Sequence, residues 1–301
     1  MKRSRAFWLA LLLGLSALAI LCCGGSVLAF TRATGSYRAP LPLIPNGVAL
    51  VEIRGIVLSG YQTYPAGIMS RDLIETLRTA DKDPQVRAIL LYINSTGGDI
   101  VASDEVYRAL KALKKPVVAY LGEIAASGAY YIACGADKIV AHPATLTGSI
   151  GVIVEIPNAQ KLLEKLGVEM VVIKSGPHKD EGSFYRGLTE EEKAYWQSLV
   201  DRLHEKFVEV VARERGLPED KVRSIADGRL CLGEDALKFG LVDSLGTFDD
   251  ALKLAGELGG IEGEPRIIRY RVTKGFLESL LYSVSHILPL TRSPHVMLVY
   301  R

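Results

Sequence analysis

The sequence has few of the residues that build metal sites or disulfide scaffolds. Its 301 residues include four cysteines and five histidines, and none of them has the spacing of metal ligands. Cys22 and Cys23 lie in a long apolar run at the N-terminus. Cys134 and Cys231 lie in shorter apolar stretches, which predicts two buried free thiols. We therefore expect no metal and no other cofactor.

The sequence also lacks a basic segment of the kind that binds nucleic acid. Lysine and arginine number 36 against 34 aspartates and glutamates. Three of the basic residues (Lys2, Arg3 and Arg5) precede the N-terminal apolar run, and without them 33 basic residues face 34 acidic ones. A nearly neutral chain without a basic patch is not expected to bind nucleic acid.

Charge is absent over one long stretch, since no charged residue occurs from position 6 to position 31. A membrane-spanning helix needs about 20 apolar residues, whereas the apolar core of a signal peptide has about 7–15. The length therefore favours a signal-anchor over residues 1–31, and the basic flank favours a cytoplasmic N-terminus. A cleaved signal peptide is the alternative, because Val27-Leu28-Ala29 forms an acceptable cleavage site. Both interpretations place the rest of the chain outside the cytoplasm.

The remainder of the chain alternates between strand and helix patterns. Residues 32–46 contain three prolines and no apolar period, which is typical of a linker. We predict strands over 48–57, 86–93, 116–120, 138–141, 150–154 and 168–173. We predict helices over 70–80, 103–113 and 158–166, one starting near 127, and a long amphipathic one opened by a capping box of Thr189 and Glu192. This alternation predicts an α/β fold with a largely parallel sheet.

Two stretches contain groups suited to acyl-transfer chemistry. The sequence "YINSTGGD" (92–99) ends a strand in a glycine pair whose N–H groups can approach a ligand closely. In "GEIAASGAYYIACGADKIV" (122–140), Ser127 stands where a strand turns into a helix, and the N–H of Gly128 is a second donor. The structural alternatives are a simple glycine turn and a serine helix cap. A nucleophilic serine is the functional interpretation, and it requires a base.

No histidine is an obvious base, so we consider lysine, which can accept a proton only while it is neutral. The segment "VVIKSGPHKDEGSFYRGLTEEE" (171–192) offers Lys174 and Lys179. Composition does not choose between them, and most lysines are solvated surface residues.

Several motifs recur together in an order that resembles the signal peptide peptidase A family of membrane-anchored Ser–Lys peptidases. They are "INSTGG", "ASGAYYIACGADKIVAHPATLTGSIGV", "KSGPHKDEGS.YR.LTEEE" and "ADGRLCLGEDALKFGLVDSLG". The resemblance covers about residues 46–255. It implies a peptidase domain over 47–258 with a Clp-protease/crotonase-like fold, a ββα superhelix with a mostly parallel sheet. Residues 259–301 are then a C-terminal extension.

The resemblance also assigns roles to residues. It implies that Ser127 is the nucleophile, that Lys179 is the general base, and that Gly98 and Gly128 supply the oxyanion donors. The family usually has proline where this chain has Thr96, which loosens the loop slightly but leaves both glycines. Two further residues, Tyr130 and Tyr131, are either the lining of an apolar substrate pocket or core aromatics.

The function implied is a membrane-anchored serine endopeptidase that degrades hydrophobic signal-peptide remnants at the extracytoplasmic face of the membrane. Family members form homo-oligomeric rings, and in short forms the serine and the lysine of one site come from neighbouring protomers. One alternative is a related peptidase, with the same dyad, that acts on misfolded or membrane proteins. A more distant one is a crotonase-type acyl-CoA enzyme, against which export and the serine–lysine pair both argue. The last is an inactive scaffold, against which the complete motif set argues.

Overall fold

The computed structural model describes residues 46–59, 67–272 and 298–300, which belong to one unit spanning residues 45–301. The predicted signal-anchor over 1–31 and nearly all of the predicted linker lie outside the described residues. Within the described ranges, no helix is both long enough and apolar enough to cross a membrane.

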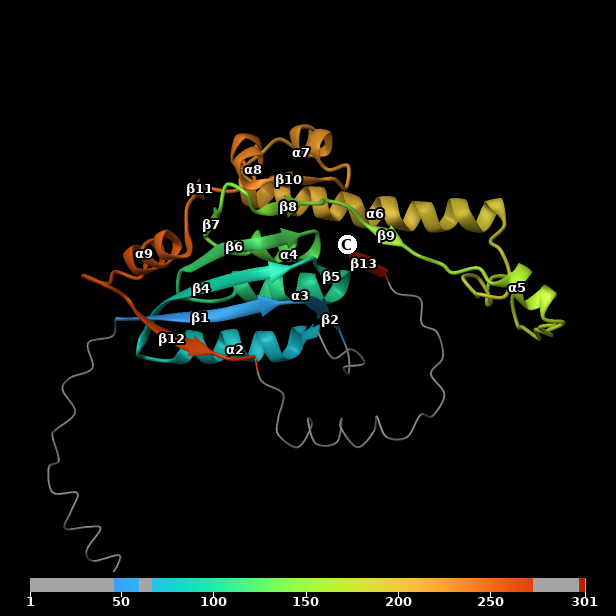
Figure 1. Cartoon of the computed structure of the whole chain (residues 1–301), viewed down its shortest axis with the longest axis horizontal. Coiled ribbons are helices and arrows are strands. Elements are labelled where there is room, and N and C mark those ends of the chain that lie inside the picture. Colours follow the sequence, from blue (N-terminus) through green and yellow to red (C-terminus); the bar gives the residue numbers. More distant parts are fainter. Residues whose placement is uncertain (1–45, 60–66, 273–297, 301) are drawn as a thin grey trace, which may run out of the picture. The chain divides into compact units, whose positions relative to one another are not determined.

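An eight-stranded sheet forms the centre of the fold (Figure 1), with strand order β10-β8-β6-β4-β1-β12, while β7 pairs with β6 and β11 with β7. The strands are β1 (Gly47–Arg54), β4 (Val86–Ser95), β6 (Val117–Ala126), β7 (Lys138–Ala141), β8 (Leu146–Gly148), β10 (Leu230–Leu232), β11 (Ser244–Leu245) and β12 (Arg266–Tyr270). All neighbours are parallel except β10 and β8. The predicted α/β fold with a mostly parallel sheet is therefore confirmed.

The apolar runs of the central strands follow from helices on both faces of the sheet. Ile89 and Leu91 of β4 pack in one core cluster with residues of α2 (Ser70–Lys82) and α3 (Ile100–Lys111). Leu90, between them, points to the opposite face and packs in a second cluster with α9 (Phe248–Leu258). The first core also contains α4 (Gly128–Ala133) and the C-terminal half of α6 (Glu190–Arg215).

A smaller five-stranded sheet has the order β3-β2-β5-β13-β9. Its strands are β2 (Ile56–Leu58), β3 (Gly67–Met69), β5 (Gly98–Asp99), β9 (Ile153–Val154) and β13 (Leu298–Tyr300). The strand predicted over 48–57 is in fact two strands, because Gly55 has a φ of 80° and turns the chain from the first sheet into the second. The C-terminal β13 runs antiparallel to both β5 and β9.

An arm, residues 155–189, extends from the sheets to the N-terminal end of α6 (Figure 1) and contains the short helix α5 (Gln160–Lys165). The predicted capping box is confirmed, since Thr189 and Glu192 exchange both hydrogen bonds at the start of α6. The strand predicted over 168–173 is wrong, because this segment has no regular secondary structure. Two of its apolar residues, Val171 and Ile173, are 81% and 97% exposed in the single chain. Two further helices, α7 (Glu219–Ile225) and α8 (Gly233–Phe239), follow α6.

Candidate active site

Ser127 lies at the turn between β6 and α4 in a strained backbone conformation. Its φ is 55° and its ψ is −123°, and only Ser149 shares a positive φ among the non-glycine residues of the described ranges. Such a conformation costs on the order of 1–3 kcal/mol and persists only where the surroundings hold it. Here the N–H of Ser127 donates to the carbonyl of Gly148 at 2.8 Å, and its own carbonyl accepts the N–H of Tyr131 at 2.9 Å.

The Ser127 hydroxyl is buried without a hydrogen-bond partner. The residue is 0% exposed, and its Oγ contacts no donor or acceptor in the described part of the chain. A structural cap would accept a backbone N–H of the first helical turn, yet α4 has no side-chain cap bond. Because an unpaired buried hydroxyl costs about 1–3 kcal/mol, both its isolation and the strain indicate a functional site.

The glycine pair that precedes α3 could not be replaced by larger residues. Gly97 has a φ of 108°, which side chains disfavour. A Cβ on Gly98 would lie 1.9 Å from the carbonyl oxygen of Val57. The loop is held from both sides, because Gly97 donates its N–H to Ser95 Oγ at 3.1 Å and accepts the N–H of Val57 at 2.9 Å.

The sheet brings Ser127, Gly128 and Gly98 to the same edge. Ser95 pairs with Ala125 across the parallel strands β4 and β6, so the segments that follow the two strands leave the sheet side by side. In addition, α4 contacts β5. Gly128 is the first residue of α4, and the first N–H groups of a helix have no partner within it. Such N–H groups are suited to binding a developing oxyanion.

Two buried hydroxyl side chains and one partly buried amide side chain support this edge, and the sequence analysis missed them. Thr145 and Thr147 donate to the carbonyls of Gly122 and Ala125 at 2.6 and 2.7 Å, and Asn94 Oδ1 accepts the N–H of Ile124 at 3.1 Å. The available signal was the run of small hydroxyl residues, "TLTGS" (145–149), between apolar strands. Polar residues in such a context are buried and hydrogen-bonded.

The two candidate lysines differ in their surroundings. Lys174 Nζ donates to Asp180 and to the carbonyl of Pro177, each at 2.7 Å. Lys179 is exposed, and we find no hydrogen bond or ion pair of its ammonium group with the described residues. It lies on the arm between α5 and α6, which is remote from α4 (Figure 1). Ser127 Oγ has no hydrogen-bond partner, so the described part of this chain shows no hydrogen bond between Ser127 and a lysine.

Tyr130 and Tyr131 both lie in the core. Tyr130 is 0% exposed and donates its hydroxyl to the carbonyl of Leu241 at 2.7 Å, and burial raises its pKa well above the usual value. Tyr131 donates to Asp104 at 2.9 Å and packs edge-on against Phe207. These are the positions that the core-aromatic interpretation predicts, and a pocket role for the two tyrosines stays a prediction.

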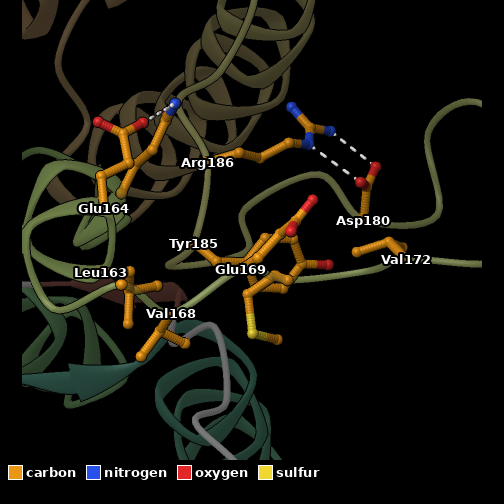
Figure 2. Close-up of a pocket in the computed structure, with 11 residues that line it drawn as sticks. Leu163, Glu164, Val168, Glu169, Val172, Asp180, Tyr185 and Arg186 are labelled. Carbon is orange, nitrogen blue, oxygen red and sulfur yellow. Dashed lines mark hydrogen bonds and ion pairs between the residues drawn. The ribbon is translucent and has the colours of Figure 1, made fainter.

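A dense ion-pair cluster lies on the arm, beside a cavity of about 590 Å³ (Figure 2). Arg186 contacts the carboxylates of both Asp180 and Glu192. The Arg186 guanidinium, followed by the Lys174 ammonium, holds the pKa of Asp180 well below its usual range. Arg186 and the backbone N–H of Thr189 lower the pKa of Glu192 to about 2.

One group of side chains on the arm could reach a cation. Ligand atoms of His178, Glu181 and Glu192 lie within 4.8 Å of one another. However, both oxygens of Glu192 already accept bonds from the Arg186 guanidinium. That fixed positive charge opposes a metal ion at the same carboxylate.

Comparisons with known proteins agree with these features. The model of "Peptidase family S49" matches residues 109–262, just over half of the chain, including Ser127 and Lys179. The model of "Clp protease" matches residues 49–147, which include Gly98.

Individual relatives give the same result. A Synechocystis sp. protein described as a candidate protease is 40% identical over 257 residues, covering 82% of this chain and 89% of that protein. Protease 4 of Salmonella typhi is 36% identical, covering 75% of this chain and 37% of its own length. The chloroplastic serine protease SPPA of Arabidopsis thaliana is 34% identical, with coverages of 74% and 33%. The chain thus spans about a third of these last two relatives, and it belongs to the S49 family of serine peptidases.

Proposed function

We propose that the chain is a Ser–Lys peptidase in which Ser127 is the nucleophile and Lys179 the general base. The observation that carries this proposal is the strained Ser127, with a buried Oγ that has no partner, at a strand-to-helix turn. The ammonium group of Lys179 has no partner among the described residues, whereas that of Lys174 is paired with Asp180, and this difference supports the choice of base.

The proposed roles define the chemistry. Neutral Lys179 accepts the Ser127 proton as Oγ attacks a peptide carbonyl carbon. The N–H groups of Gly98 and Gly128 then bind the oxyanion of the tetrahedral intermediate, and each such donor is worth roughly 3–4 kcal/mol. Protonated Lys179 returns the proton to the leaving amine, and water hydrolyses the resulting acyl-enzyme by the same steps.

In this proposal Lys179 acts on the Ser127 of a second copy of the chain in a ring-shaped homo-oligomer. Two observations support a shared site. The arm that carries Lys179 lies away from α4 (Figure 1), and it exposes apolar residues such as Val171 and Ile173 that a partner would cover. The match of the Clp-protease model over residues 49–147 supports a ββα superhelix within each protomer.

We propose hydrophobic signal-peptide remnants as the substrate and the extracytoplasmic membrane face as the location. A relative from Enterococcus faecium, 40% identical over 60% of this chain, carries the name of a candidate signal peptide peptidase. The charge-free run at positions 6–31 supports a membrane anchor beside such peptides. Protease added to intact spheroplasts should digest the domain that contains Ser127; digestion only after lysis would show the opposite orientation.

The nucleophile is tested with a matched pair of serines. Ser103 is also fully buried, and its Oγ has no partner among the described residues, but it lies inside a helix, as the fourth residue of α3. We expect Ser127→Ala to abolish hydrolysis of a hydrophobic reporter peptide and labelling by a serine-reactive probe, while Ser103→Ala keeps both. Near-normal hydrolysis by a folded Ser127→Ala variant would show that Ser127 is not the nucleophile.

A further inference from the structure

The turn that carries Lys179 is fixed by backbone hydrogen bonds and by neighbouring side chains, and not by the Lys179 side chain. The Lys179 N–H donates to the carbonyl of Gly176 at 3.3 Å, and Ser183 donates to the carbonyl of Asp180 at 3.2 Å. The next residue in the chain, Asp180, points its carboxylate toward Arg186 (Figure 2). The position of the Lys179 backbone therefore depends on what holds Asp180.

Arg186 holds Asp180 with two parallel hydrogen bonds. Its Nε donates to Oδ2 at 3.1 Å, and one terminal nitrogen donates to Oδ1 at 2.8 Å. Such bidentate pairs between guanidinium and carboxylate groups fix direction as well as distance.

The same guanidinium also holds the start of the longest helix. Its two terminal nitrogens donate to the two oxygens of Glu192 at 2.8 and 2.7 Å. Glu192 lies in the first turn of α6, where its carboxylate also accepts the N–H of Thr189 at 2.8 Å. Arg186 thus connects the turn that carries Lys179 to the first turn of α6, a helix of 26 residues.

Little else could replace Arg186 at this place. The Asp180 and Glu192 side chains are only 9% and 7% exposed, so without Arg186 two shielded carboxylates would face each other. Of these two carboxylates, Lys174 forms an ion pair only with Asp180. A lysine at position 186 would keep the charge, but an ammonium group cannot bind two carboxylates in the planar, bidentate manner of a guanidinium.

We propose that Arg186 is the positioning residue of the general base, because it clamps the turn of Lys179 to the first turn of α6 through Asp180 and Glu192. The proposal rests on the proposed function of Lys179. Arg186 is not expected to touch the substrate, so its effect should be on turnover and not on substrate affinity.

The kinetic test compares Arg186→Gln and Arg186→Lys with the control Arg223→Gln in the full chain. Arg223 is a matched control, because it also joins carboxylates of two helices, Glu205 of α6 and Glu219 of α7. We expect both Arg186 variants to lose about 10- to 100-fold in kcat with less than about a twofold change in KM, since small misplacements of reacting groups cost that much. Arg223→Gln should stay within about twofold of the wild type in both constants.

A double-mutant cycle tests whether Arg186 acts through Lys179. If it does, adding Arg186→Gln to Lys179→Ala should lower the residual rate no further. A further loss of 10-fold or more, or a kcat of Arg186→Gln within twofold of the wild type, would overturn the proposal.

Amide hydrogen exchange gives a readout that does not depend on catalysis. Exchange over residues 177–187 should become at least about 10-fold faster in both Arg186 variants, and exchange in β4 should not change. Unchanged exchange over 177–187 would refute the clamp. If Lys179→Ala kept full activity, the proposed function would fail, whereas the exchange comparison would still decide whether the clamp exists.

Discussion

At the residue scale, Lys174 and Lys179 show how local contacts separate two similar side chains. Both lie in the segment that follows the apolar run 168–173, and composition did not distinguish them. The structure pairs the Lys174 ammonium with Asp180, so Lys174 is an exposed surface residue that also forms an ion pair. A lysine that serves as base must present a free amine to the nucleophile, and of the two only Lys179 has an ammonium group without a described partner.

We predict that Lys179→Arg is as inactive as Lys179→Ala. Arginine keeps the positive charge but stays protonated at any working pH, so it cannot accept the serine proton. Lys174→Ala removes one of two cations from Asp180, and we expect it to lose less than about fivefold, because a partly exposed ion pair contributes about 0–1 kcal/mol. The measurement is hydrolysis of a hydrophobic reporter peptide by the three variants. An inactive Lys174→Ala beside an active Lys179→Arg would show that the roles are reversed.

The sequence predicted those features of the candidate site that depend only on where the strands end. Ser127 and the glycine pair were placed at the ends of predicted strands, and parallel strands bring such ends together. The strain at Ser127 and the close approach of Gly98 to Val57 could not be predicted, because both depend on contacts between segments distant in sequence. The Arg186 clamp was missed although Asp180 and Glu192 each lie only six positions from Arg186, because the turns between them carry no periodic signal.

At the element scale, the arm contains a segment whose sequence pattern predicts a strand that the single chain does not form. The apolar run 168–173 predicts a strand, but a strand needs a neighbour to pair its backbone groups. No described segment of the same chain provides one. The capping box of α6, by contrast, was predicted correctly, because its two residues lie only three positions apart.

We predict that acid loosens the arm before it unfolds the central sheet. The pKa of Glu192 falls from a usual 4.5 to about 2 in the folded chain, and that of Asp180 is also lowered. A carboxyl group with a lowered pKa stabilises the folded state at pH values above its pKa in the unfolded chain. This stabilisation is lost as the pH falls through its pKa in the folded chain. Amide exchange over 177–187 should therefore rise, relative to β4, between about pH 4.5 and pH 2. Arg186→Gln should remove this pH dependence, and equal protection of the arm at both ends of the range would contradict the prediction.

At the scale of the whole molecule, the family and the mostly parallel sheet were predictable. Alternating helix and strand patterns determine the layers, and several motifs in a fixed order indicate the family. The second sheet was not predicted, because its strands are two to three residues long and carry no periodic signal. The pairing of β13 with β5 joins segments about 200 positions apart.

We predict that two inactive variants restore activity when they assemble together. If each site takes Ser127 from one copy and Lys179 from its neighbour, coexpressed Ser127→Ala and Lys179→Ala chains form some complete sites. Random assembly in equal amounts should give about a quarter of the wild-type activity, because half of the serines are intact and half of those have an intact neighbour. Each variant alone is the control. A mixture with no more activity than either variant would mean that the dyad forms within one chain.

The distance of the Lys179 arm from α4 (Figure 1) has a consequence for the life of the enzyme in the cell. If the base comes from a second copy, a newly made chain has no complete active site. It cannot cleave the proteins around it while it is alone. Proteolysis would begin only once the local density of chains allowed assembly, so the abundance of the protein would set a threshold for its own activity.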